Sequence, residues 1–149
     1  METQFPRGVE VITGLIIRNK EGKIFLATGK KWHNKWIIVG GHIEPGETIL
    51  EGALREGKEE TGLDLKPVAI INFGEMIGSP NFHRPAHFIY FDCLFEAENN
   101  DVKIADEELT EHKWVTPEEA LTMITNPSTH KAIEKYIEWL KLSTALPRT

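Results

Sequence analysis

Apolar runs separated by polar turns along the chain predict several short strands. Val9–Arg18 and Lys23–Ala27 are β-rich apolar runs, and the polar Lys20-Glu21-Gly22 between them is typical of a tight hairpin connection. Further strands are predicted at residues 36–39, 68–73, 86–95, 102–104 and 113–115.

A helical spacing of apolar residues predicts three helices between and after these strands. Residues 47–61 repeat with helical periodicity, and Gly62 is a suitable C-terminal stop. Thr116 can cap a helix over residues 117–124, and residues 129–142 form a last amphipathic helix. The order of strands, helix, strands and helices predicts an α+β or mixed α/β class in one domain.

Composition and charge narrow the functions open to the chain. Its 149 residues, 40% apolar and 27% charged, are typical of a single globular domain. The net charge of −6 argues against a protein that coats duplex nucleic acid. No apolar run approaches the ~20 residues of a membrane span. With a polar N-terminus and Cys93 as the single cysteine, we expect a cytoplasmic protein without an intramolecular disulfide.

Acidic residues gather in the first predicted helix and the loop before it. Residues 41–63 hold six glutamates against one arginine and one lysine. On a helical wheel one stripe is suited to face the core, while a neighbouring face carries Glu56, Glu59 and Glu60. The residues of the stripe are Leu50, Ala53, Leu54, Gly57 and Thr61.

Glu56 and Glu60 stand one helical turn apart, where like charges repel each other. Arg55 lies within helical reach of Glu51 and Glu59, and an ion-pair ladder accounts for those three residues. The spacing places no cation beside Glu56 and Glu60. A hard divalent cation such as Mg²⁺ or Mn²⁺ would neutralise the pair, and a solvated acidic edge is the alternative.

The segment over residues 41–63 resembles the signature box of the Nudix hydrolases. Gly57 departs from the pattern, which has an aliphatic residue there, and this departure bears on packing. The resemblance implies an α/β/α sandwich with a mixed central sheet, formed by a single domain over residues 1–149. The matching positions are Gly41, Glu47, Arg55, Glu56, Glu59, Glu60, Gly62 and Leu63.

The same resemblance implies hydrolysis of a nucleoside diphosphate linked to another group, with Mg²⁺ as the cofactor and Mn²⁺ as its substitute. Glu56 and Glu60 would be metal ligands, and Glu59 a ligand or the base that activates water. The carbonyl oxygen of Gly41 would add a ligand. Glu47 would pair with Arg55 and hold the loop against the helix.

A second acidic group precedes Trp114 and comprises Asp106, Glu107, Glu108 and Glu111. Related enzymes often place an additional metal-binding or catalytic carboxylate in such a loop. Glu108 is our choice for this role, with Glu107 second, because a loop can swing over a bound diphosphate. An exposed acidic turn is the alternative interpretation.

Two loops carry side chains suited to a nucleotide. Lys31 and Lys35 can contact phosphates, and Trp32 can stack on a base. Asn81, Phe82 and Arg84 combine hydrogen bonding, stacking and charge. Either loop can equally be an ordinary polar loop.

A looser resemblance concerns the substrate. His87–Cys93, Val102–Ile104, Glu107-Glu108 and Trp114-Val115 resemble segments of bacterial Nudix nucleoside triphosphatases that favour pyrimidine deoxynucleotides. They favour hydrolysis of a (d)NTP to a (d)NMP and pyrophosphate. The alternatives are an ADP-ribose or sugar-nucleotide pyrophosphatase and a non-catalytic nucleotide-binding module. We expect a nucleotide ligand, neither duplex nucleic acid nor a membrane, and leave a homodimer open.

Overall fold

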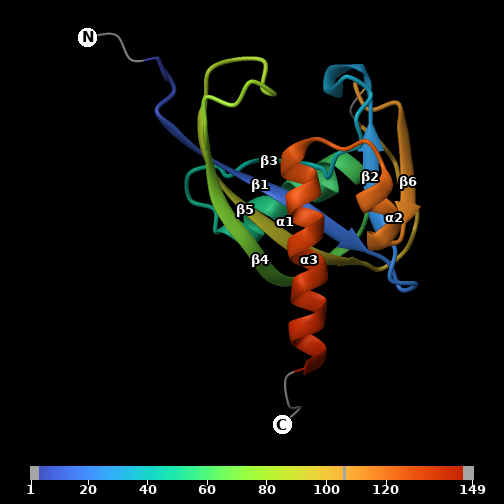
Figure 1. Cartoon of the computed structure of the whole chain (residues 1–149). Helices are drawn as coiled ribbons and strands as arrows, with labels where there is room; N and C mark the ends of the chain where they lie inside the picture. The colour runs from blue at the N-terminus through green and yellow to red at the C-terminus, as the bar shows by residue number, and fades with distance from the viewer. Residues whose placement is uncertain (1–3, 106, 146–149) are drawn as a thin grey trace.

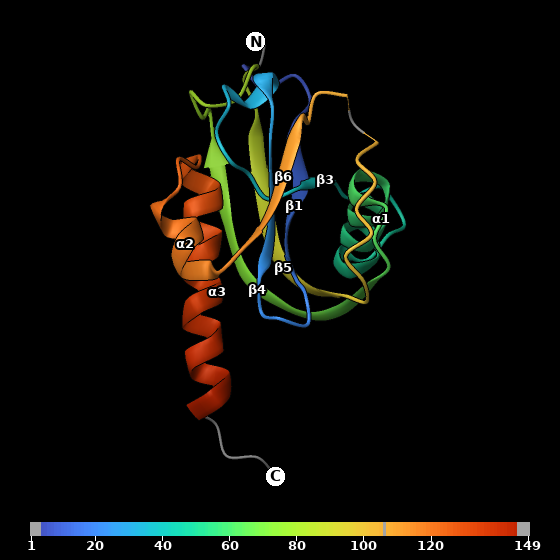
Figure 2. The same cartoon turned by 90° about the vertical axis from the view of Figure 1, so that its right-hand side faces the viewer.

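A six-stranded sheet lies between helices in the computed structural model of the chain, which describes residues 4–105 and 107–145. The helices are α1 (Ile49–Thr61), α2 (Pro117–Thr122) and α3 (Pro127–Ala145), with a 3-10 helix η1 at Lys30–Trp32. In Figure 2 the sheet has α1 on one side and α2 and α3 on the other, which confirms the α+β class and the predicted sandwich. The strands are β1 (Val9–Arg18), β2 (Ile24–Thr28), β3 (Gly40–His42), β4 (Leu65–Ile77), β5 (His87–Ala97) and β6 (Glu111–Val115).

The sheet is mixed, and β1 lies at its centre. Its strand order is β4-β5-β1-β2-β6, with β3 paired to β1 off this path. β1 runs parallel to β5 and antiparallel to β2 and β3. Leu15 and Ile17 of β1 join the core beneath α1, whereas Ile16 joins the core beneath α2 and α3. Burial on both faces explains why β1 is a continuous apolar run rather than an alternating one. In Figure 1 α3 crosses the front of the sheet.

Helix α1 packs closely on the sheet because its buried side carries small residues. Ala53 is fully buried, and a Cβ atom at Gly57 would lie 2.6 Å from methyl groups of Leu15 and Leu65. The glycine that departs from the Nudix pattern therefore marks a close contact between the helix and the sheet. Leu54, by contrast, is half-buried at the margin of the core.

The strand predicted at residues 36–39 lies elsewhere: β3 begins only at Gly40. Trp36 and Ile37 form isolated bridges, and Val39 accepts a hydrogen bond from the amide of Leu15. A Cβ atom at Gly40 would overlap the Thr13 carbonyl oxygen. The pairing with β1 therefore needs a glycine, and the apolar residues before it fill the core instead.

The predicted strand at residues 102–104 is also wrong. This segment is irregular, and the Lys103 amide donates to the Thr61 carbonyl at the end of α1. The helices are confirmed with shifted ends: α1 begins at Ile49, with Thr48 as its N-cap, rather than at Glu47. Gly62 adopts the left-handed conformation expected of a helix stop, with φ 69°. None of the helices in the described part of the chain is long and apolar enough to cross a membrane.

Candidate active site

Arg55 holds the loop before α1 against the helix. Its Nε donates to Glu47 Oε2 at 2.8 Å and its Nη2 to Glu47 Oε1 at 2.9 Å, a bidentate pair. Nη2 also donates to the His42 carbonyl at 3.0 Å. The Arg55 hydrogen bonds, and then the Glu44 amide, lower the pKa of Glu47 to about 2. The predicted pairing of Glu47 with Arg55 is present.

Arg55 also contacts two glutamates of the acidic face. Nη1 donates to Glu56 Oε1 at 3.0 Å and to Glu59 Oε2 at 3.4 Å. The prediction that Glu56 has no cation nearby is therefore wrong. That prediction considered only helical neighbours three and four residues away. Because Glu47 rather than Glu51 holds the Arg55 guanidinium, Nη1 can reach the adjacent residue, Glu56.

The carboxyl group of Glu56 lies against the backbone of Gly41. A Cβ atom at Gly41 would lie 2.5 Å from Glu56 Oε2 and 2.6 Å from Oε1, so a side chain here would displace the carboxylate. Glu60 lines the same cavity as Gly41. Carboxylate and carbonyl oxygens are the donors that Mg²⁺ and Mn²⁺ prefer, so this donor set suits such an ion. Within residues 4–105 and 107–145, no three His, Cys, Asp or Glu side chains are already gathered around a common point.

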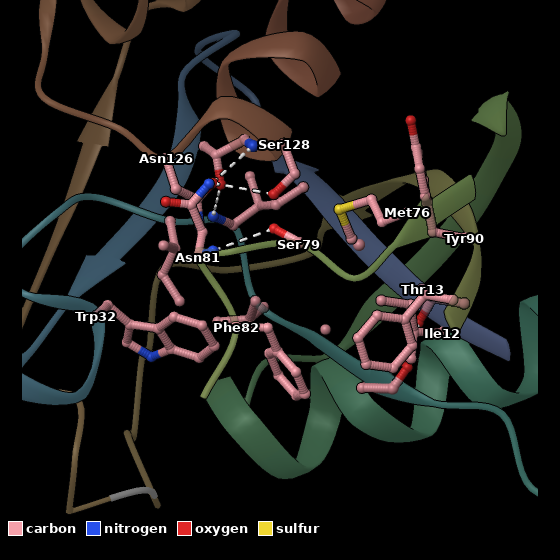
Figure 3. Close-up of a pocket in the computed structure, with 18 of the residues that line it drawn as sticks. Ile12, Thr13, Trp32, Met76, Ser79, Asn81, Phe82, Tyr90, Asn126 and Ser128 are labelled. Carbon is pink, nitrogen blue, oxygen red and sulfur yellow. Dashed lines mark hydrogen bonds between the residues drawn. The ribbon is translucent and has the colours of Figure 1, made fainter. Parts of the chain in front are cut away.

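A cavity of about 460 Å³ opens beside Gly41, where η1, the β4–β5 connection and the start of α3 meet over β1 and β5. Figure 3 shows the aromatic rings of Trp32 and Phe82 along it. Lys35 is not among the described residues that line the cavity, and its carbonyl accepts a hydrogen bond from Thr28 Oγ1 at 2.8 Å. The predicted substrate residues that do line it are Lys31, Trp32, Asn81, Phe82 and Arg84.

Arg84 is bound to Glu10 of β1 at the wall of this cavity. Its two terminal nitrogens donate to the Glu10 carboxylate at 2.8 and 2.7 Å, while its guanidinium lies 5.1 Å from the centre of the Phe82 ring. His42 lies 2.9 Å from the same carboxylate. The Arg84 hydrogen bond is the main cause that lowers the pKa of Glu10 to about 2. Arg84 therefore holds the ring of Phe82 as well as carrying charge.

Glu108 meets a cation that its sequence neighbourhood does not contain. Lys31 Nζ of η1 lies 2.9 Å from Glu108 Oε2, and the two side chains remain 43% and 54% exposed. The ion pair joins two segments of the chain. η1 carries Lys31, which is predicted to contact phosphates, and the loop before β6 carries Glu108, the predicted catalytic carboxylate. Asp106 of the same acidic group lies outside the described residues.

A polar group that was not predicted from the sequence lies on the floor of the cavity. Asp92 of β5 lines the cavity yet is only 5% exposed, and Asn72 of β4 donates to its Oδ2 at 2.9 Å. Burial raises the pKa of Asp92 to about 6. A lone acidic residue inside an apolar strand was the signal that could have found it.

Comparison with known proteins shows the family of the chain. Residues 9–140 match the NUDIX domain family, and the chain belongs to this family, the Nudix hydrolases. Nucleoside triphosphatase NudI from Escherichia coli O81 is 35% identical over 107 residues, which cover 66% of this chain and 74% of that protein. Nudix hydrolase 5 from Arabidopsis thaliana is 32% identical over 71% of this chain, but the match spans only 36% of the plant protein.

Solved structures support the fold. A MutT protein from Methanosarcina mazei Go1 has a TM-score of 0.69 and 26% identity, with 89% of this chain and 96% of that chain covered. A NUDIX hydrolase from Nitrosomonas europaea has a TM-score of 0.70 at 22% identity, covering 94% of this chain and 97% of that chain, a likeness of fold alone.

Proposed function

We propose that this protein is a metal-dependent pyrophosphohydrolase that converts a (d)NTP into a (d)NMP and pyrophosphate. The observation that carries the proposal is the contact of the Glu56 carboxylate with the backbone of Gly41, at the border of an aromatic-lined cavity. Acidic oxygens beside a space for a planar ring suit a substrate with a charged phosphate end and a base. The relative named as a nucleoside triphosphatase supports the same substrate class.

Glu56, Glu59, Glu60 and the carbonyl of Gly41 would hold Mg²⁺, or Mn²⁺ in its place. When bound, such an ion neutralises phosphate charge and makes a water molecule easier to deprotonate. Arg55 serves this arrangement by holding Glu56 and Glu59 on the side of the helix where Gly41 lies. Its bidentate bond to Glu47 fixes the guanidinium, so the carboxylates are oriented before any ligand arrives.

The cavity residues divide the remaining tasks. Trp32 and Phe82 stack on the base, Asn81 hydrogen-bonds to it, and Lys31 contacts the phosphates. In the structure Lys31 is paired with Glu108, so a phosphate that attracts Lys31 breaks this ion pair. Glu108 then accepts the proton of the attacking water or helps to hold a further cation, while Glu59 positions that water.

The test is product identification with the whole chain. The protein is incubated with Mg²⁺ and, separately, with NTPs, dNTPs, ADP-ribose, sugar nucleotides and dinucleoside polyphosphates, with a chelator in a parallel set. We expect a nucleoside monophosphate and pyrophosphate from triphosphates, and no product with the chelator. AMP and ribose 5-phosphate from ADP-ribose as the dominant products would replace the proposal with the alternative activity. The cytoplasmic location stays a prediction. A homodimer stays one as well, and sedimentation analysis tests it.

A further inference from the structure

A row of aligned residues crosses the sheet beneath the cavity. Asn72 of β4 stands opposite Asp92 of β5, Asp92 opposite Gly14 of β1, and Gly14 opposite Gly40 of β3. Gly40 directly precedes Gly41, against which the Glu56 carboxylate lies. One row of the sheet therefore joins a buried acid to the start of the Nudix box.

The spacing along this row suits a nucleotide. Neighbouring strands lie about 4.8 Å apart, so two steps place Asp92 roughly 10 Å from Gly40. A nucleotide that reaches Gly41 with its phosphates is long enough for its sugar and base to extend over this row. A base in that position would lie above Asp92 and Gly14, both of which line the cavity.

The two oxygens of Asp92 have different surroundings. Oδ2 accepts the hydrogen bond from Asn72, which fixes the orientation of the carboxyl group. Oδ1 lies over Gly14, where a Cβ atom would stand 2.7 Å from it and 2.8 Å from a methyl group of Ile38. Within the described part of the chain, the donor to this carboxyl group is Asn72. Oδ1 is thus the atom that can meet a ligand.

A buried acid at this position needs a reason, because burying a carboxyl group costs stability unless its polar atoms are satisfied. Asn72 donates to Oδ2 and fixes the carboxyl group. The β5 face that Asp92 shares with Tyr90 and Phe88 turns towards the cavity, where a bound base can donate to Oδ1. The aromatic neighbours are suited to the rest of that base.

We propose that Asp92 selects the base of the substrate, with Oδ1 accepting a hydrogen bond from an exocyclic amino group. The favoured substrates are then nucleotides of amino-bearing bases, such as cytosine, over those of uracil and thymine. This inference rests on the proposed function, because it takes the cavity to hold a nucleotide. Asn72 acts as a positioning residue that holds the carboxyl group in the accepting orientation.

Cytosine and uracil nucleotides provide the sharpest contrast, since they share a shape and differ where an amino group replaces a carbonyl. An ionised carboxylate only accepts hydrogen bonds, so the uracil carbonyl would face another acceptor. A hydrogen bond to a charged group contributes about 1.5–3 kcal/mol, which corresponds to roughly a tenfold or greater preference. We therefore expect kcat/KM for dCTP to exceed that for dUTP by at least about tenfold.

The variant Asp92→Asn tests the assignment, because an amide can donate to a carbonyl and has nearly the same shape. We expect the ratio of kcat/KM for dCTP to that for dUTP to fall about tenfold or more in this variant. Asp64→Asn removes an exposed carboxyl group outside the cavity and should leave the ratio unchanged. If Asp92→Asn does not fold, Asn72→Ala replaces it, and the ratio should again fall.

Equal use of dCTP and dUTP by the unaltered protein, or an unchanged ratio in Asp92→Asn, would overturn the inference and leave the proposed function intact. Calorimetric dissociation constants for dCMP and dUMP provide a second readout. If no triphosphate is hydrolysed, the proposed function fails, while tighter binding of dCMP that Asp92→Asn abolishes would still support the inference. Equal binding of the two, or binding of neither, would overturn it.

Discussion

At the scale of single residues, Arg55 organises the acidic helix. One guanidinium meets Glu47, Glu56 and Glu59, and the side chain is itself 26% exposed. Its bond to Glu47 joins the helix to the loop before it. This bond therefore fixes the position of the loop, which an ion-pair ladder within the helix would not do. Arg55 and Glu56 are consequently one unit, and a change to either alters the other.

Glu56→Gln tests the metal role at this scale. A neutral amide is a poor ligand for Mg²⁺, so we expect turnover at limiting Mg²⁺ to collapse while the fold is retained. The measurements are Mg²⁺-dependent turnover of a triphosphate and thermal unfolding. Glu51→Gln, on the same helix but exposed, is the matched control and should keep full activity. Unchanged turnover in Glu56→Gln would remove Glu56 from the metal site.

Glu108→Gln tests the loop carboxylate. If Glu108 accepts the proton, kcat should fall by ~10²–10⁴ with the stability nearly unchanged, and the pH profile should lose its acidic limb. Glu111→Gln is the control, since Glu111 is an exposed carboxylate of the same acidic group to which no role is assigned. Full kcat with the parent pH profile in Glu108→Gln, together with an inactive Glu59→Gln, would assign the role to Glu59 alone.

At the scale of elements, α1 is held by its contacts with the sheet and by the turn that follows it. Leu63, one residue beyond the helix stop, is fully buried, whereas Leu54 on the helix is only half-buried. The helical wheel placed Leu54 on the core stripe correctly but could not show how far the sheet extends beneath it. The small Ala53 and Gly57 instead make the closest approach.

Truncation of these two leucines should separate the contributions. Leu63→Ala empties a fully buried site, so we expect a loss of about 2–5 kcal/mol in the free energy of unfolding. Leu54→Ala removes a partly exposed side chain and should cost less than about 2 kcal/mol. Urea titration of both variants measures the difference. A larger loss for Leu54→Ala would show that the helix packs with a different face.

At the scale of the whole molecule, Glu10 connects β1 to the loop between β4 and β5 through Arg84. The folded pKa of Glu10, about 2, lies below its usual value of 4.5. The Glu10 carboxylate therefore binds a proton more readily in the unfolded state than in the folded state. The stabilisation is complete above about pH 4.5 and is lost as the pH falls towards 2.

We expect the free energy of unfolding to decrease as the pH falls from 4.5 to 2. In Glu10→Gln this decrease should be smaller, because the glutamine does not titrate. The variant should also be less stable than the parent at pH 7. Urea unfolding at a series of pH values measures both effects. Arg7→Gln, which removes a mostly exposed partner at 3.8 Å, is the control and should change little.

Asp92 has the opposite effect on the molecule. Burial raises its pKa from 3.8 to about 6, so the folded state holds this proton more firmly than the unfolded state. The contribution of Asp92 to the free energy of unfolding is most favourable below about pH 3.8. This contribution falls as the pH rises through 6. The stability of Asp92→Asn relative to the parent should therefore be higher at pH 8 than at pH 5. Thermal unfolding of both proteins at the two pH values measures this difference. An equal difference at both pH values would contradict the shift.

Neighbours within a few residues were enough to predict the helices, most of the strands and the Nudix box. Apolar periodicity and the stop at Gly62 placed α1, and Thr116 marked the start of α2. These features depend on neighbours within a few residues, so spacing alone shows them. The fixed positions of residues 41–63 were visible for the same reason, and they identified the family.

Which distant groups meet is visible only in the folded chain. Lys31 reaches Glu108, Arg84 reaches Glu10, and Asp92 joins Asn72 from residues far apart in sequence. The strand at Gly40 likewise depends on how closely β1 can approach a residue without a side chain. Such contacts follow from strand register and sheet packing, which periodicity within one segment does not contain, and they set the charges and the shape of the cavity.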